Sequence, residues 1–316
     1  MEPITFRPLY QERVWGGREL ERVYGRELPE AETPFGESWE LVDRDPEQAV
    51  VDQGDFAGQS LHELWTTRRE DLFGADLEPS PQFPILIKIL DARDDLSIQV
   101  HPPAELAEAL GGEPKTEMWY IADCEPGATL YVGLKHGVTR GDFEQAIHAG
   151  TVADCVHAVK PQPGESIFIR SGRIHAIGAG FLIFEIQQNS DTTYRVFDWN
   201  RHGLDGKPRA LHVAESLASI DFHDYEPTMD AAPDGVLAAC EYFRVTKRES
   251  LAGERIGNPQ PERFSIVAVV RGTLQSAGGR RLGSGTVAIL PKNSLPMICV
   301  EGATLLQIII PDRPGP

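Results

Sequence analysis

Short β-type segments separated by turn residues are the feature of this sequence that most limits how the chain can fold. Each segment is strand-sized and is bounded by Gly, Pro, Asn or Asp, which favour turns. We find no helix–strand alternation of the kind that builds a parallel sheet, and no Gly-rich dinucleotide or phosphate-loop motif. The pattern therefore predicts a mainly β chain of antiparallel sandwiches or jelly rolls. The segments are Pro84–Leu90, Ser97–His101, Glu117–Ala122, Thr129–Val132, Ser166–Arg170, Phe181–Gln187, Thr193–Trp199, Phe264–Val270, Gly285–Leu290 and Thr304–Ile310.

Helical patterning is local, and we expect it to mark short insertions in the β fold. Leu61–Leu72 and Ala104–Leu110 have helical patterns, and Thr139 is a candidate N-cap for a helix that ends at Gly150. Residues 151–159 are expected to form a further helix.

A polar, acidic, proline-bearing segment, Asp224–Gly235, has the composition of a linker between domains. All nine histidines precede it, the last being His223. We therefore predict an N-terminal domain at 1–223 that carries any metal site, a linker at 224–238, and a C-terminal barrel without metal ligands at 239–316.

Charge and composition limit the classes of partner. The formal net charge of −18 argues against nucleic acid or an anionic membrane as the main partner. No secretory signal is visible, and the longest apolar runs are shorter than the roughly 20 residues of a membrane span. The four cysteines form no C-x-x-C pair, which is typical of intracellular thiols. A cytoplasmic protein is the expectation.

Polar and apolar residues alternate strictly from Leu96 to His101. In a strand, the apolar residues at 96, 98 and 100 would share one face, and Ser97, Gln99 and His101 would share the other. If the apolar face fills the core, the polar face lines a cavity. A Gln oxygen and a His nitrogen two residues apart can then reach one ion.

Two later segments add candidate ligands. Glu117 shares a strand face with Lys115, and a Ser-Gly turn after another strand leads to His175. Together with Gln99 and His101, these side chains form a mixed oxygen and nitrogen set suited to zinc. Spacing alone leaves the site open, because a single strand histidine is more often an ordinary core or surface residue.

Glu185 lies in an apolar strand, where an unpaired carboxylate is costly to bury. Arg195 follows ten residues later, beyond an Asn-Ser-Asp turn. A structural Glu–Arg pair across a hairpin and a functional role are both consistent with this pattern. Trp119 is expected to pack in the wall of the cavity.

These segments together resemble the type I phosphomannose isomerases, in the short form typical of many bacteria. The resemblance covers nearly the whole chain and is densest from 84 to 200; beyond 224 it is loose. The Gln-Val-His-Pro string at residues 99–102 is its most specific motif. The matching strings are Trp15–Gly17, Gly36–Glu40, Pro84–Pro102, Lys115–Tyr120, Ser171–Gly178 and Gln188–Arg195.

The resemblance implies two cupin-type barrels and a zinc-dependent interconversion of mannose 6-phosphate and fructose 6-phosphate through an enediol, with one zinc ion per chain. It leaves open whether Glu185 or a metal-bound water moves the proton, and whether Arg195 or Lys115 holds phosphate or stabilises the enediolate. It places the metal ligands on Gln99, His101, Glu117 and His175, and the catalytic and substrate-binding groups on Lys115, Arg195, Glu185 and Ser97.

Two departures from the family pattern concern loop shape. Arg170 stands where many relatives have Pro, and Pro103 stands where an acidic residue is common. Neither removes a ligand. The alternatives are a cupin oxygenase, in which a second His would be expected at Gln99, and a non-catalytic sugar-binding or regulatory cupin. The oligomeric state, monomer or weak dimer, is left open.

Overall fold

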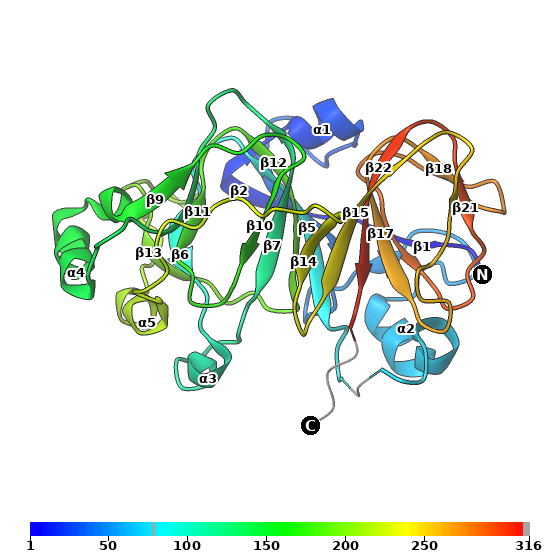
Figure 1. Ribbon diagram of the computed structural model, residues 1–316, viewed down its shortest axis with the longest axis horizontal. Helices are drawn as coiled ribbons and strands as arrows, with labels where there is room; N and C mark the ends of the chain where they lie inside the picture. The colour runs from blue at the N-terminus through cyan, green and yellow to red at the C-terminus, as the bar shows by residue number, and fades with distance from the viewer. Residues whose placement is uncertain (78–79, 312–316) are drawn as a thin grey trace. The chain divides into compact units, whose positions relative to one another are not determined.

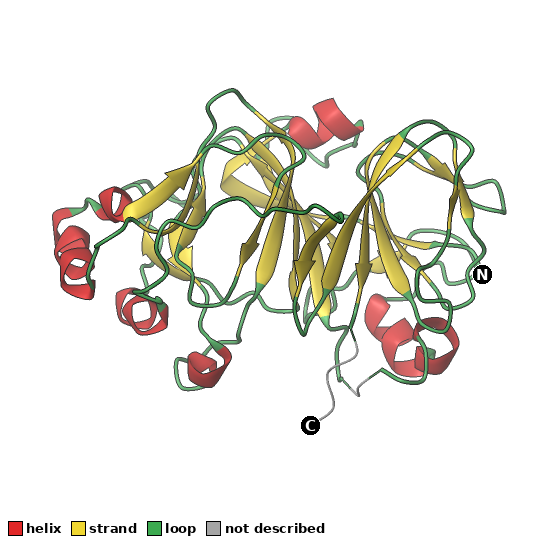
Figure 2. Ribbon diagram, in the orientation of Figure 1, coloured by secondary structure: helices red, strands yellow, loops and turns green. Residues whose placement is uncertain are grey.

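The computed structural model describes residues 1–77 and 80–311, and β-strands make up most of its ordered elements (Figures 1 and 2). The predicted mainly β, cupin-like fold is confirmed. The chain forms two compact units. The central unit contains 10–38 and 88–230, and the C-terminal unit contains 1–9, 39–87 and the chain from Ala231 onward. The division at 224–238 stays a prediction, since the second unit also takes in segments from the N-terminal part.

Two sheets contain the strands of the central unit. Their strand pairs, such as β7 with β12 and β6 with β11, are antiparallel. From β5 to β8 and from β10 to β13, successive strands alternate between the sheets. One sheet has the order β10 (Ser166–Ile169), β7 (Glu117–Cys124), β12 (Phe181–Gln188), β5 (Ile85–Ala92), β2 (Leu9–Gly17) and β3 (Phe35–Leu41). The other has the order β13 (Tyr194–Phe197), β6 (Ile98–Val100), β11 (His175–Ile177), β8 (Leu130–Leu134) and β9 (Val156–Val159).

Short helices lie outside these strands (Figure 2). In α4 (Arg140–Ala149), Thr139 forms the predicted N-cap in a capping box with Asp142, and Gly150 ends the helix at φ 71°. The helix expected at 151–159 is confirmed only as a 3-10 helix in its first half and is wrong for 156–159. A 3-10 turn at Val152–Cys155 leads directly into β9, where Val156 and Val159 are β-branched and pair with β8. The other helices of this unit are α1 (Glu19–Tyr24), α3 (Ala104–Ala107) and α5 (Val213–Ser219).

Two glycines allow β2 and β3 to approach closely. A Cβ at Gly16 would lie 2.4 Å from the backbone nitrogen of Gly36, and a Cβ at Gly36 would lie 2.6 Å from the Trp15 ring. Any side chain at either position would therefore push the strands apart. This approach allows Arg13 on β2 to reach Glu37 on β3.

The C-terminal unit is also built from antiparallel strand pairs. Its helical segment, expected at 61–72, consists of α2 (Leu61–Thr67) and a π-helix at Arg69–Phe73. One sheet has the order β14 (Val236–Ala239), β15 (Arg244–Ser250), β22 (Ala303–Ile309), β17 (Ser265–Arg271), β20 (Val287–Leu290), β1 (Ile4–Arg7) and β4 (Val50–Val51). The other has the order β16 (Arg255–Ile256), β21 (Met297–Cys299), β18 (Leu274–Gln275) and β19 (Arg281–Leu282). Among the described residues, no helix has the length and apolarity to cross a bilayer.

Candidate active site

Three of the predicted site residues lie side by side in one sheet of the central unit. Gln99 on β6 pairs with His175 on β11 and with Arg195 on β13. Directly opposed residues on neighbouring strands share a face of the sheet, so these three side chains point to the same side. Ser97, two residues before Gln99, shares that face and accepts a 3.2 Å hydrogen bond from Arg195 Nε. The predicted alternation holds from Ser97 to Val100 but not at Leu96, which packs in the cluster of Trp119 and lines the cavity, whereas Ile98 and Val100 pack in a separate cluster.

The other sheet brings charged side chains to the site. Glu117 begins β7, and on β12 Glu185 lies opposite Trp119 of that strand. Lys88 on β5 is buried, with its Nζ 3.6 Å from Glu185 Oε1. Lys115, just before β7, is buried as well.

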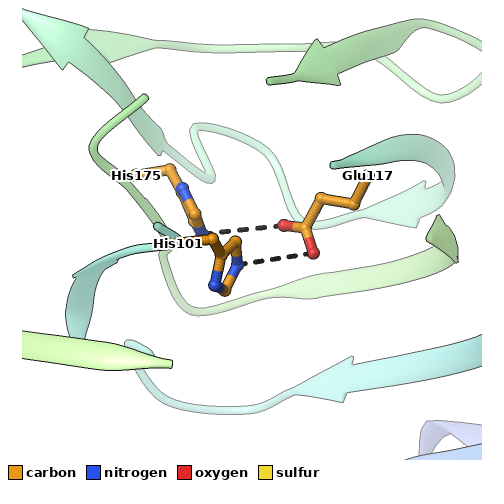
Figure 3. A group of neighbouring side chains, drawn as sticks. All are labelled: His101, Glu117 and His175. Atoms are coloured by element: carbon orange, nitrogen blue, oxygen red, sulfur yellow. Dashed lines mark ion pairs between the residues drawn. The ribbon is translucent and has the colours of Figure 1, made fainter. Parts of the chain in front are cut away.

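His101, Glu117 and His175 form a compact, fully buried cluster (Figure 3). One ligand-type atom from each residue lies within 4.8 Å of the others. His101 Nε2 is 3.5 Å from Glu117 Oε2, and His175 Nε2 is 3.6 Å from Glu117 Oε1. In Figure 3 the two imidazole rings lie together on one side of the Glu117 carboxylate, and a dashed line joins each ring to it. These separations leave space for one ion among the three side chains.

The hydrogen bonds of the cluster are those expected of a metal site. The Nδ1 atoms of His101 and His175 bond to the carbonyl oxygens of Thr192 and Arg173, at 2.8 and 2.9 Å. Each ring therefore carries its proton on Nδ1 and presents an unprotonated Nε2 as a possible ligand atom, 3.4 Å from Lys115 Nζ in His101 and 3.3 Å from Gln99 Nε2 in His175. Burial, followed by the charge of His101, lowers the pKa of His175 to about 3, and burial also lowers the pKa of His101.

The oxygens of Glu117 give the most direct indication that this group of residues fits a cation. Oε1 is buried without a hydrogen bond in the described residues, its polar contact being the ion pair with His175, whereas Oε2 is paired with Lys115 Nζ at 2.6 Å. Lys115 compensates the carboxylate on the Oε2 side, and the buried Oε1, which has no such partner, suits a second cation on the side of the imidazoles. Gln99 lies beside the cluster, with its amide Nε2 3.3 Å from His175 Nε2. A half-turn of the amide would present the oxygen there instead.

A row of alternating charges runs away from the cluster. Lys115 Nζ is 2.6 Å from Glu117 Oε2 and 3.7 Å from Glu185 Oε1. Burial opposes the charge of Lys115, but the carboxylates of Glu117 and Glu185 raise its pKa. Burial likewise opposes the charge of Glu117, whose pKa Lys115 and His101 hold well below its usual value. Burial and the charge of Glu117 raise the pKa of Glu185 above its usual value.

Arg195 marks a positively charged end of the site. Its Nη1 donates to the Ala210 carbonyl at 3.0 Å. Burial, and then the charge of Arg209, lower the pKa of Arg195. Arg201 and Arg209 both pair with Asp198, which holds them in place. Positive charges thus gather here in excess of the nearby carboxylate, a pattern suited to a multivalent anion.

Beside the buried cluster, one cavity of about 440 Å³ in the central unit is lined by Lys115, Glu185 and Arg195 among these groups. This volume suits a small ligand. Leu204, on the loop that carries Arg209, and His212, which precedes α5, also line it. The remaining lining residues are Glu12, Arg13, Val14, Trp15, Glu37, Lys88, Leu90, Leu96, Ser97, Gln99, Asp191, Thr193 and Gly203.

Some of these residues were not predicted from the sequence. Lys88 lies in an apolar strand, as Glu185 does, and the same argument about the cost of a buried charge identifies it. The Arg13–Glu37 pair and Arg209 had no comparable signal. The hairpin pairing of Glu185 with Arg195 is wrong, because β12 and β13 belong to different sheets. Glu185 pairs instead with Lys88 and Lys115.

Comparisons with known proteins agree on one family. The family described as "Phosphomannose isomerase type I, catalytic domain" matches residues 4–130. Mannose-6-phosphate isomerase ManA of Bacillus subtilis is 37% identical over 280 residues, 86% of each chain. The probable mannose-6-phosphate isomerase GmuF of that organism is 38% identical over 90% of this chain and 89% of that protein. A crystal structure of the mannose 6-phosphate isomerase from B. subtilis aligns with TM-score 0.86 and 31% identity, covering 98% of this chain and 100% of that one.

Proposed function

The chain belongs to the type I phosphomannose isomerase family, and we propose that its central unit interconverts mannose 6-phosphate and fructose 6-phosphate with one bound zinc ion. The observation that carries this proposal is the buried His101–Glu117–His175 cluster beside a cavity lined with charged groups. Related proteins named as mannose-6-phosphate isomerases, which align along most of the chain, support the choice of substrate.

For the metal, we propose His101, Glu117 and His175 as ligands, with Gln99 as the fourth. Two neutral imidazoles, a carboxylate with one oxygen free of hydrogen bonds and an amide oxygen suit zinc, which accepts both nitrogen and oxygen ligands. When bound, the ion supplies Lewis-acid stabilisation of negative charge on the sugar oxygens.

For proton transfer, we propose Glu185. Isomerisation of the open-chain sugar removes the proton at C2 and returns one at C1, with an enediol between. Burial raises the pKa of this carboxyl group. A carboxylate with a raised pKa is a stronger base than an exposed one, because its pKa is closer to neutral pH. Glu185 Oε1 lies between Lys88 and Lys115, at 3.6 and 3.7 Å.

Lys115 and Arg195 are proposed to have separate roles. Lys115 lies close to the metal cluster and stays protonated, so its point charge suits an enediolate oxygen. Arg195 lies with Arg209 and Arg13 among the cavity-lining residues, so its guanidinium suits the phosphate. Ser97 orients Arg195 through the hydrogen bond to Nε.

The test is the metal content of the purified protein, measured together with its rate on mannose 6-phosphate in a coupled assay. Chelation should abolish activity, and zinc should restore it. Full turnover in stringently metal-free protein would overturn the role of the metal. A panel of mannose, glucose and ribose phosphates tests the substrate. Oxygen uptake by iron-loaded protein would instead favour the cupin oxygenase. The cytoplasmic location stays a prediction.

A further inference from the structure

We propose that Trp119 is a positioning residue whose indole N–H fixes the direction of the Glu185 carboxylate. Trp119 on β7 lies directly opposite Glu185 on β12. Its Nε1 donates a 3.0 Å hydrogen bond to Glu185 Oε2, and the two side chains are almost completely buried. The inference rests on the proposed function, in which Glu185 moves the proton.

The two oxygens of Glu185 have different surroundings. Trp119 holds Oε2, whereas Oε1 lies 3.6 Å from Lys88 Nζ and 3.7 Å from Lys115 Nζ. These separations are longer than a hydrogen bond, so Oε1 is attracted by two positive charges without being tied to either. One oxygen is therefore fixed, and the other is available to a ligand in the cavity that Glu185 lines.

Trp119 is itself held firmly. It packs in an apolar cluster with Ile121, Ile167 and Ile183, all fully buried. Its ring meets the His175 ring edge-on, with centroids 5.3 Å apart and planes at 79°. The indole thus contacts the proposed base on its own sheet and a candidate metal ligand on the facing sheet.

This arrangement matters because one base has to serve two carbon atoms. A carboxylate that rotates can lose its proton to water or to another group before it returns the proton to the sugar. A donor fixed on Oε2 keeps Oε1 directed at the substrate through both half-reactions. The N–H group of Trp119 is therefore expected to control how much hydrogen is carried directly from C2 to C1.

The experiment compares Trp119→Phe with Trp65→Phe. Trp65, in the C-terminal unit, is equally buried and donates one 3.0 Å hydrogen bond, to the Ser80 carbonyl. Trp119→Phe keeps a ring in the apolar cluster and removes the N–H. We expect kcat to fall roughly tenfold, with KM and metal content near those of the wild type. In D₂O, the product of Trp119→Phe should contain more solvent-derived deuterium per turnover than the product of the wild type. Trp65→Phe should change neither the rate nor the origin of the hydrogen.

Unchanged kcat and hydrogen transfer in Trp119→Phe would overturn the inference, and so would a rate loss that simply follows a loss of metal. If the Phe variant does not fold, benzothienylalanine placed at 119, which replaces N–H by sulfur at nearly the same volume, gives the same test. Glu185→Gln separates the two proposals. Normal turnover in Glu185→Gln overturns the role of Glu185 itself. An inactive Glu185→Gln beside a normal Trp119→Phe overturns only the role of Trp119.

Discussion

The two units use the same kind of antiparallel sheet but fill their interiors differently. The core of the C-terminal unit is an apolar cluster that includes Val267, Leu274, Ala288 and Leu305. In the central unit, apolar clusters share the interior with buried charged residues, which gather around the cavity. The comparison teaches that the sandwich does not by itself make a site. A site requires inward positions that do not contribute to apolar packing.

The central unit must also compensate the cost of its polar interior. Charge taken out of water is costly unless it is paired, and removing one partner of a buried pair leaves the other uncompensated. Lys115 and Glu117 are fully buried and in contact, and Lys88 and Lys115 both face Glu185. Loss of a metal ligand or of a charged side chain is therefore expected to disturb the interior of the central unit most. The interior of the C-terminal unit is expected to be disturbed most by loss of side-chain volume.

The largest expected effect is that of His175→Ala, which should remove the metal and lower kcat/KM by about a thousandfold or more. The reason is that one of two imidazole nitrogens is lost from the cluster. Metal analysis and the coupled assay measure this effect. His62→Ala is the matched control, because His62 lies in the C-terminal unit and pairs with Asp43. Retained metal in His175→Ala would contradict the ligand assignment.

Leu305→Ala should have a large effect on stability and little on catalysis. Leu305 is fully buried in the apolar cluster of the C-terminal unit, and truncating it should lower the free energy of unfolding by about 3 kcal/mol. Denaturant titration gives the stability, and metal content with kcat should stay as in the wild type. Leu251→Ala, at a residue 73% exposed in the same unit, is the control. Loss of metal from folded Leu305→Ala would break the contrast between the units.

Arg195→Ala should lower kcat/KM roughly a hundredfold, because the group proposed to hold the phosphate is removed. Arg280→Ala serves as the control, since Arg280 pairs with Asp52 in the C-terminal unit. If Arg195→Ala turns over at a nearly normal rate, the role given to Arg195 is wrong. Arg195→Lys distinguishes the need for a planar guanidinium from the need for charge alone.

The smallest effect expected for a single step, here one pH unit, is a pH dependence of stability in the metal-free protein. The pKa of His175 falls from 6.5 to about 3 on folding, so between these values the unfolded chain binds a proton that the folded chain does not. The free energy of unfolding should therefore fall as the pH is lowered through this window, by up to about 1.4 kcal/mol per pH unit. Urea titrations of the wild type and of His175→Gln measure it. Equal slopes in the two proteins would contradict the assignment.

Much of the fold and part of the site could be predicted from local pattern. The alternation around β6 sets which of Ser97, Ile98, Gln99 and Val100 share a face, because successive residues of a strand point to opposite sides. The cap at Thr139 depends only on neighbouring residues and is confirmed. The helix expected at 151–159 fails at 156–159 because pairing with β8 decides the conformation of β9, and this pairing involves residues more than twenty positions away.

The sequence by itself determined the mainly β character of this protein and the candidate ligands on individual strands, since both follow from the chemistry and period of short segments. Only the tertiary structure decided which strands share a sheet. It placed Glu185 with Lys88, Lys115 and Trp119 and not with Arg195, and it added Arg13, Glu37 and Arg209 to the cavity. The physical reason is that strands distant in sequence are joined into a sheet by backbone hydrogen bonds. Every residue except proline can form these bonds, so the side-chain pattern of one strand does not identify its partner.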